Sequence, residues 1–140
     1  MITHSAEETK NAAADLAATL QGGEMIALVG DLGAGKTTFV QGLAAALGAT
    51  ARVKSPTFTV MNEYPVHHPT IHRLIHLDLY RFTSADELRA LSLEDELRND
   101  TVVVIEWPNA LPTVSWQPDV TVTISHGAQP EERAIDIVRA

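Results

Sequence analysis

The sequence contains no cysteine, and aromatic residues make up only 5% of its 140 residues. Without cysteine there can be no disulfide bond, no thiolate nucleophile and no zinc site built from cysteine. No apolar run reaches the length that spans a membrane, and the first ten residues lack a basic segment followed by an apolar one. We therefore expect a soluble, unexported protein of the reducing cytoplasm.

Basic residues are also scarce: 10 of them stand against 18 acidic residues, for a formal net charge of −8. This balance disfavours tight unaided binding to nucleic acid, which requires clustered Lys and Arg. A protein with this charge that serves an RNA would do so through a partner, although the acidity is also explained by solubility alone. The length suits one domain with a real core, so we expect a single domain over residues 1–140.

One stretch, residues 30–37 with the sequence Gly-Asp-Leu-Gly-Ala-Gly-Lys-Thr, fits the phosphate-loop pattern G-x-x-x-x-G-K-[ST] at every fixed position. Glycines in this pattern let backbone N–H groups turn inward on a polyphosphate. Lys36 would reach the β- and γ-phosphates, and Thr37 would offer its hydroxyl to Mg²⁺ at a helix N-terminus that favours anions. The alternative is a glycine-rich turn that binds no ligand.

The segments on either side of this loop argue against that alternative. Residues 25–29 form an unbroken apolar run, which is typical of a parallel strand buried on both faces. After the loop, apolar residues recur at helical spacing from Phe39 to Leu47, and Gly48 follows at the position of a C-cap glycine. The order strand, loop, helix is the one that a nucleotide-binding phosphate loop requires.

The rest of the chain predicts an α/β fold. The remaining expected elements are a packing helix over residues 5–20, strands over residues 57–64, 71–79 and 101–105, short helices that start near residues 84 and 92, and a closing hairpin of strands 120–124 and 134–138. We expect a three-layer α/β domain of the phosphate-loop NTPase type, in which a mixed sheet has a parallel core and antiparallel edge strands.

Two acids stand where the second half of a nucleotide site is expected. Glu106 directly follows the apolar strand 101–105, where phosphate-loop proteins carry a carboxylate that holds Mg²⁺ or orients the attacking water. An exposed carboxylate at the end of a strand is the alternative for Glu106. In the strand 71–79, His76 and Asp78 alternate with apolar residues, so they either line a site or form a satisfied buried cluster.

Two further absences narrow the choice of nucleotide and reaction. The sequence has no Asn-Lys-x-Asp segment of the kind that reads guanine, which favours ATP over GTP. The arginines after Lys36 are dispersed rather than gathered in a lid, which disfavours a small-molecule kinase without excluding it. A small-molecule phosphotransferase and a nucleotide-dependent binding switch with negligible turnover therefore stay open beside an ATPase.

Four motifs in series resemble the bacterial TsaE family, which has the older name YjeE. They are the phosphate loop continued to Phe39, residues 53–59 (Val-Lys-Ser-Pro-Thr-Phe-Thr), residues 76–81 (His-Leu-Asp-Leu-Tyr-Arg) and residues 105–108 (Ile-Glu-Trp-Pro). The resemblance implies an ATPase needed for N6-threonylcarbamoyladenosine, which is made on the adenosine beside the anticodon of ANN-decoding tRNAs. It also implies two protein partners, TsaD and TsaB, with the tRNA contacted only indirectly through the complex.

The resemblance assigns roles to individual residues as well. Lys36, Asp78 and Glu106 match the family's catalytic residues, and Thr37 and Glu106 match its Mg²⁺ ligands. The nucleotide-binding residues that it implies are Gly33, Ala34, Gly35, Lys36, Thr37 and Thr38.

Further positions of interest lie outside the phosphate loop. Ser55, Thr57 and Thr59 resemble a switch-like loop that senses the γ-phosphate and metal or faces a partner, and Trp107 follows the acid as in the family. Arg133 is expected in the hairpin connection, where the family approaches the nucleotide. Because no arginine finger is evident in the chain, we expect hydrolysis to be weak alone and stimulated in the complex.

Overall fold

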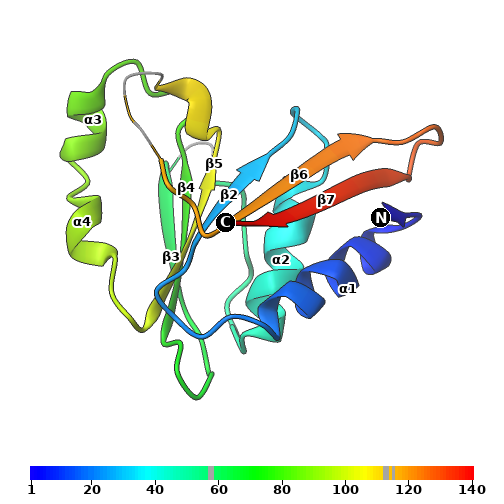
Figure 1. Cartoon of the computed structure of the whole chain (residues 1–140), viewed down its shortest axis with the longest axis horizontal. Coiled ribbons are helices and arrows are strands. Elements are labelled where there is room, and N and C mark those ends of the chain that lie inside the picture. The colour runs from blue at the N-terminus through cyan, green and yellow to red at the C-terminus, as the bar shows by residue number, and fades with distance from the viewer. Residues whose placement is uncertain (57–58, 112–113, 115) are drawn as a thin grey trace.

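The computed structural model describes residues 1–56, 59–111, 114 and 116–140. Its strands are β1 (Ile2–Thr3), β2 (Met25–Val29), β3 (Met61–Pro65), β4 (Arg73–Asp78), β5 (Thr101–Glu106), β6 (Val120–His126) and β7 (Arg133–Arg139). Its helices are α1 (Ala6–Ala17), α2 (Lys36–Ala46), α3 (Ala85–Arg89) and α4 (Leu93–Glu96), with a 3₁₀ turn η1 (Pro108–Ala110). Within the described residues, the strands form one seven-stranded sheet in the order β1-β7-β6-β2-β5-β4-β3 (Figure 1).

The centre of this sheet is parallel and its edges are antiparallel, as expected. Strand β2 pairs in parallel with both β5 and β6, and β5 pairs in parallel with β4. Strands β3, β7 and β1 are added antiparallel at the two edges. In this register Glu106 is the partner of both Leu28 and Asp78. The loop after β2 and the acids that end β5 and β4 therefore meet where the carboxyl ends of the central parallel strands lie side by side.

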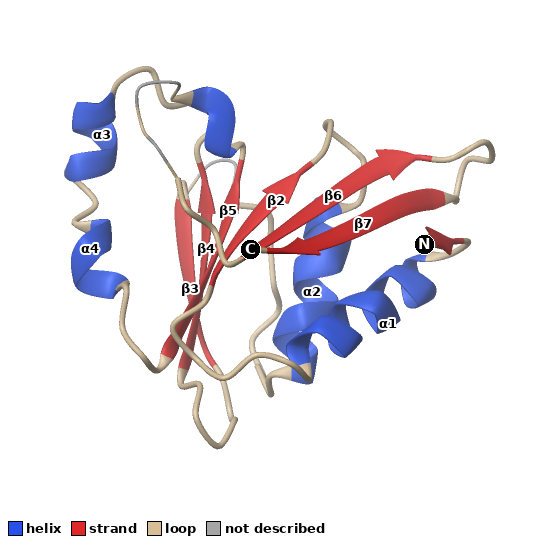
Figure 2. Ribbon diagram, viewed as in Figure 1, coloured by secondary structure: helices blue, strands red, loops and turns tan. Residues whose placement is uncertain are grey.

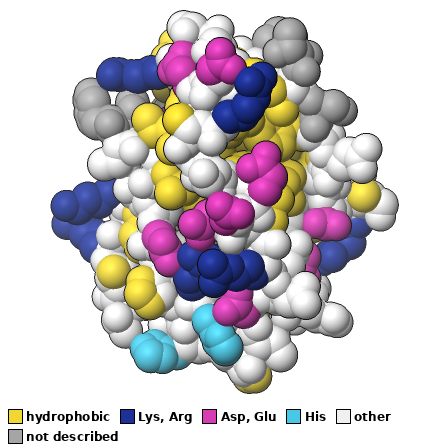
Figure 3. All heavy atoms as spheres, turned by 90° about the vertical axis from the view of Figure 1, so that its left-hand side faces the viewer, with side chains coloured by type: hydrophobic (Ala, Val, Ile, Leu, Met, Phe, Trp, Pro, Cys, Tyr) yellow, Lys and Arg dark blue, Asp and Glu magenta, His cyan; other side chains and the backbone are white. Residues whose placement is uncertain are grey.

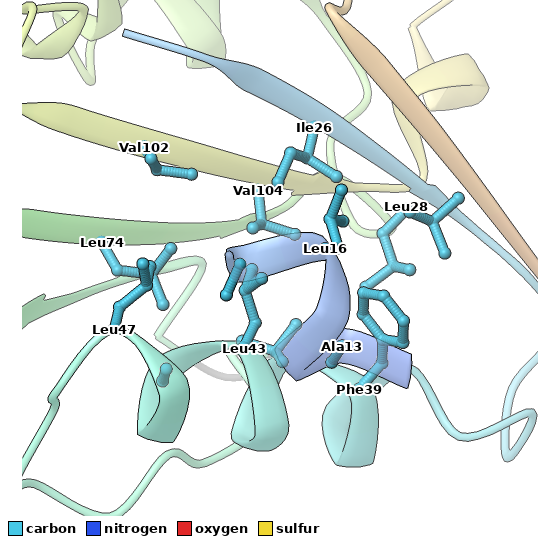
Figure 4. Packing of buried hydrophobic residues seen from close by; sticks show 14 of the residues in the cluster. Ala13, Leu16, Ile26, Leu28, Phe39, Leu43, Leu47, Leu74, Val102 and Val104 are labelled. Atoms are coloured by element: carbon cyan, nitrogen blue, oxygen red, sulfur yellow. The ribbon is translucent and has the colours of Figure 1, made fainter. Parts of the chain in front are cut away.

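Helices α1 and α2 pack together on one face of the sheet, and α3 and α4 lie beside the other (Figure 2). The larger core cluster fills the first interface, where Phe39 and Leu43 of α2 lie beneath sheet residues such as Leu28 (Figure 4). The second cluster includes Ile75 and Leu93 on the opposite face. Figure 3 views the molecule from that side and shows hydrophobic side chains at the surface beside acidic and basic ones. None of the helices in the described ranges has the length and apolar character needed to cross a bilayer.

Several predicted boundaries are confirmed. Strand β2 spans the predicted residues 25–29, and α1 begins with the expected cap, in which the Glu8 N–H donates to Ser5 Oγ at 3.1 Å. Gly48 ends the helix after the phosphate loop with a φ of 90°. The closing hairpin is present as the antiparallel pair of β6 and β7.

Other boundaries were wrong. The predicted strand 57–64 starts at residues 57 and 58, which lie outside the described residues. Among the described ones β3 begins at Met61, because Val60 has a left-handed φ of 69°, and it includes Pro65, which the outer position of β3 tolerates. Helix α1 ends at Ala17 rather than at residue 20, and the two-residue β1 was not predicted. The pairing of β1 with β7 depends on a partner more than a hundred residues away, which local patterns cannot reveal.

Helix α1 approaches α2 closely at Gly42, and this predicts the effect of a substitution. A Cβ atom on Gly42 would lie 2.6 Å from the Cα atom of Lys10. Gly→Ala inside a helix normally stabilises by about 1 kcal/mol, but here overpacking should reverse the sign and cost roughly 1–3 kcal/mol. Urea unfolding of Gly42→Ala measures this change, with the exposed Ala46→Ser as the control. An unchanged or raised midpoint for Gly42→Ala would contradict the close packing.

Candidate functional site

The phosphate loop wraps one side of a cavity of about 330 Å³. Gly33 and Gly35 have φ values of 78° and 104°, in the left-handed region where a side chain would be strained. Gly35 is the N-cap of α2, and it has no side chain with which to cap the helix. The free N–H groups at this helix start are therefore left for a ligand. The residues that line the cavity are Leu32, Gly33, Gly35, Lys36, Thr37, Thr38, Ser55, Asp78, Glu106, Trp107 and Arg133.

Lys36 is the buried cation of the site. Its Nζ donates to the Gly30 carbonyl oxygen at 2.7 Å and lies 3.9 Å from the centroid of the Trp107 ring. Burial lowers the pKa of Lys36, while the negative charges of Glu106 and Asp78 act in the opposite direction. The ammonium is thus held at the cavity with few protein groups to solvate it, which suits it to bind an anion.

Asp78 and Glu106 end neighbouring strands and lie beside each other in register. Their exposed fractions are only 7% and 3%. Asp78 Oδ1 accepts a hydrogen bond from the Tyr80 N–H at 2.9 Å, but burial raises the pKa of Asp78 and the nearby Glu106 raises it further. Glu106 is therefore not an exposed carboxylate at the end of a strand.

A fully buried histidine holds Glu106 from within the sheet. His76 Nε2 lies 2.9 Å from Glu106 Oε2, and among the described residues no partner faces His76 Nδ1. The sequence placed His76 on the polar face of its strand but not its partner, because the contact depends on the register of β4 against β5. A carboxylate fixed in this way keeps one oxygen in a constant position at the cavity.

Trp107 lines the cavity beside the lysine of the phosphate loop. Its backbone has a left-handed φ of 57°, which is unusual for a bulky residue. Its ring lies over the Lys36 ammonium, and its centroid is 4.9 Å from that of Tyr80. The sequence pointed to Trp107 only by resemblance. It gave no signal for the contact of Trp107 with Lys36 or with the Tyr80 ring.

The structure gathers most of the predicted site residues but not all of them. Ala34 is a fully buried residue of the loop itself, and its carbonyl oxygen accepts from Arg133 Nε at 2.8 Å. Arg133 begins β7 instead of lying in the hairpin connection. Thr59 is not among the residues that line the cavity, and its hydroxyl donates to Asn62 Oδ1 at 2.6 Å. Thr57 lies outside the described residues.

The donor set fits a Mg²⁺ ion that arrives with a polyphosphate. Mg²⁺ is usually held by one or two carboxylates together with phosphate oxygens and waters rather than by a cage made of protein alone. Glu106 and the Thr37 hydroxyl line the same cavity as Lys36. In the part of the chain that the structure describes, no three His, Asp or Glu side chains form a metal cluster. A cation that is bound jointly with phosphate oxygens is the one that these residues suit.

Comparisons with known proteins agree with this geometry. The family model described as "Threonylcarbamoyl adenosine biosynthesis protein TsaE" matches residues 3–135. The chain is 37% identical over 129 residues to the "tRNA threonylcarbamoyladenosine biosynthesis protein TsaE" of Bacillus subtilis (strain 168), which covers 92% of this chain and 78% of the relative. The protein of the same name from Aquifex aeolicus (strain VF5) is 41% identical over 109 residues, or 76% and 74% of the two chains. The "Crystal structure of Bacillus subtilus YdiB" superposes with a TM-score of 0.72 at 30% identity, covering 99% of this chain and 83% of that one.

The raised pKa of Asp78 predicts that this residue destabilises the fold at neutral pH. An acid whose pKa is higher in the folded than in the unfolded chain reduces stability as the pH rises past the unfolded value, and the loss is complete above the folded value. Asp78→Asn should therefore raise the melting temperature at pH 7, because its amide oxygen still accepts from Tyr80. The gain should shrink toward about pH 4, near the pKa of an unfolded aspartate, and vanish below it, where Asp78 is neutral in both the folded and the unfolded chain. Melting curves at the two pH values measure this, with exposed Asp15→Asn as the control. A lower melting temperature at pH 7 would show that the ionised Asp78 stabilises the fold.

Proposed function

The chain belongs to the TsaE family, and we propose that it is the ATPase of tRNA threonylcarbamoyladenosine biosynthesis. One observation carries the proposal: a buried lysine, two buried acids and a glycine-rich helix start surround a single cavity. Hydrolysis of a nucleotide requires little covalent help from protein, so positioning and charge neutralisation are the main contributions that such a site makes.

Each group has a distinct part in this proposal. The loop N–H groups and Lys36 would bind the β- and γ-phosphates of ATP, and Thr37 and Glu106 would hold Mg²⁺. Bound Mg²⁺ would supply charge neutralisation on the phosphate oxygens. Asp78 or Glu106 would accept a hydrogen bond from the attacking water and so orient it. His76 supports this arrangement because it holds Glu106 at 2.9 Å from beneath the cavity.

The partners that we propose are TsaD and TsaB, with the tRNA contacted only through their complex. The net charge of −8 supports this indirect role, since it opposes unaided binding to a phosphate backbone. Arg133 is the one arginine among the described residues that line the cavity, and its Nε and Nη1 already donate to backbone carbonyls. We therefore expect slow hydrolysis by the chain alone and faster hydrolysis with the partners. We also propose that the chain acts as one domain, because a single sheet joins all its described strands.

Phosphate release from Mg²⁺-ATP tests this function. The chain should release phosphate slowly alone and faster with TsaD and TsaB, and Lys36→Ala should abolish the release because the phosphates lose their buried cation. Arg89→Ala removes an exposed cation that does not line the cavity and is the control. Equal rates with and without the partners would contradict the coupled role. A phosphorylated metabolite in place of free phosphate would identify a small-molecule kinase.

Substitutions of the two acids should affect hydrolysis of ATP more than affinity for the nucleotide. Glu106→Gln keeps an oxygen that accepts from His76 but removes the charge, so hydrolysis should fall by roughly 100-fold or more. Affinity for ADP measured without Mg²⁺ should change far less, because neither the metal nor an attacking water takes part in that binding. Titration calorimetry and single-turnover hydrolysis measure the two effects on the same variant. Full hydrolysis by Glu106→Gln, combined with its loss in Asp78→Asn, would assign the water to Asp78 instead.

A further inference from the structure

Arg133 links the C-terminal hairpin to the phosphate loop. It begins β7, where it pairs with His126 of β6 and with Thr3 of β1, so its backbone is fixed between two strands. Its Nε donates to the Ala34 carbonyl oxygen at 2.8 Å. Its Nη1 donates to the carbonyl oxygens of Pro130 and Glu132, both at 2.8 Å. One guanidinium therefore joins the loop to the connection between the hairpin strands.

This contact determines how one peptide of the loop is oriented. In a trans peptide the C=O and the following N–H point in opposite directions, and the described residues contain no cis peptide. Because the Ala34 carbonyl points to Arg133, the N–H of Gly35 must point to the opposite side of that peptide. Gly35 is among the residues that line the cavity, and as the N-cap of α2 it lies at the positive end of the helix dipole.

The rest of Ala34 is already fixed by other contacts. Its side chain is fully buried, and its N–H donates to the Asp31 carbonyl oxygen at 3.1 Å. The carbonyl is the remaining polar group of this residue. At φ 104° Gly35 has no side chain to restrict its own rotation, so the loop needs an outside group to hold the peptide between the two residues.

We propose that Arg133 is a positioning residue that holds the Ala34–Gly35 peptide with its N–H directed at the phosphates. The inference rests on the proposed function only in taking the anion to be the polyphosphate of a nucleotide. Lys36 anchors Gly30 in a similar way, but its ammonium must also serve the phosphates. The bonds of Arg133 to carbonyl oxygens need not break when the ligand enters, so the loop stays ordered.

The test compares Arg133→Gln and Arg133→Lys with the control Arg139→Gln at the other end of β7. Titration calorimetry measures binding of ADP and of inorganic pyrophosphate, which has the phosphates without the nucleoside. Arg133→Gln should weaken both ligands by a similar factor of roughly 10-fold or more, the effect of losing one hydrogen bond from a charged donor. Arg133→Lys should not restore binding, because a single ammonium cannot reach carbonyls on both segments.

The outcomes separate this proposal from the proposed function. If the wild-type chain binds neither ADP nor pyrophosphate, the cavity is not a nucleotide site and the proposed function is wrong. If the wild type binds and Arg133→Gln binds equally well, Arg133 does not position the loop. If Arg133→Gln binds ADP more weakly but pyrophosphate as tightly as the wild type, Arg133 acts on the nucleoside. If Arg133→Lys binds both ligands as tightly as the wild type, only the charge of Arg133 matters. Either result would overturn the proposal. If Arg133→Gln does not fold, as its melting curve would show, Arg133→Lys decides the result.

Discussion

The parallel pairing of β5 with both β2 and β4 is the constraint on which the site depends. In this register the carboxyl ends of the three strands meet at one edge, where Glu106 pairs with Leu28 on one side and with Asp78 on the other. The phosphate loop leaves β2 at the same edge and leads directly into α2. A shift of one residue in β5 would turn Glu106 to the opposite face of the sheet, away from Lys36 and His76.

The charges gathered at this edge are unfavourable without a ligand. Burial lowers the pKa of Lys36 and raises that of Asp78, so each ionised group lacks solvation that it would have in water. The contacts of Lys36 with the Gly30 carbonyl and the Trp107 ring compensate for only part of this loss. A polyphosphate with a divalent cation would supply the missing partners for both signs of charge. Such a ligand would also raise the folding stability of the chain, since it binds the folded state alone.

The sequence predicted the fold where a local pattern was sufficient. The phosphate loop, the apolar strand before it, the helix after it and the acid that ends β5 were all evident from spacing and residue type. What the sequence could not reveal depends on partners distant along the chain: the pairing of β1 with β7, the contact of His76 with Glu106 and the reach of Arg133 to Ala34. Trp107 was notable by resemblance, but its place over Lys36 follows from a backbone turn that no propensity predicts.

A crystal structure of the chain with Mg²⁺ and a non-hydrolysable ATP analogue would test the central claim most directly. We expect the phosphates to lie between the loop and Glu106, with Lys36 Nζ moved from the Gly30 carbonyl to a phosphate oxygen. We also expect the Ala34 carbonyl to stay on Arg133. A nucleotide bound elsewhere, with Lys36 still on Gly30 and Trp107, would contradict the assignment of this cavity as the nucleotide site.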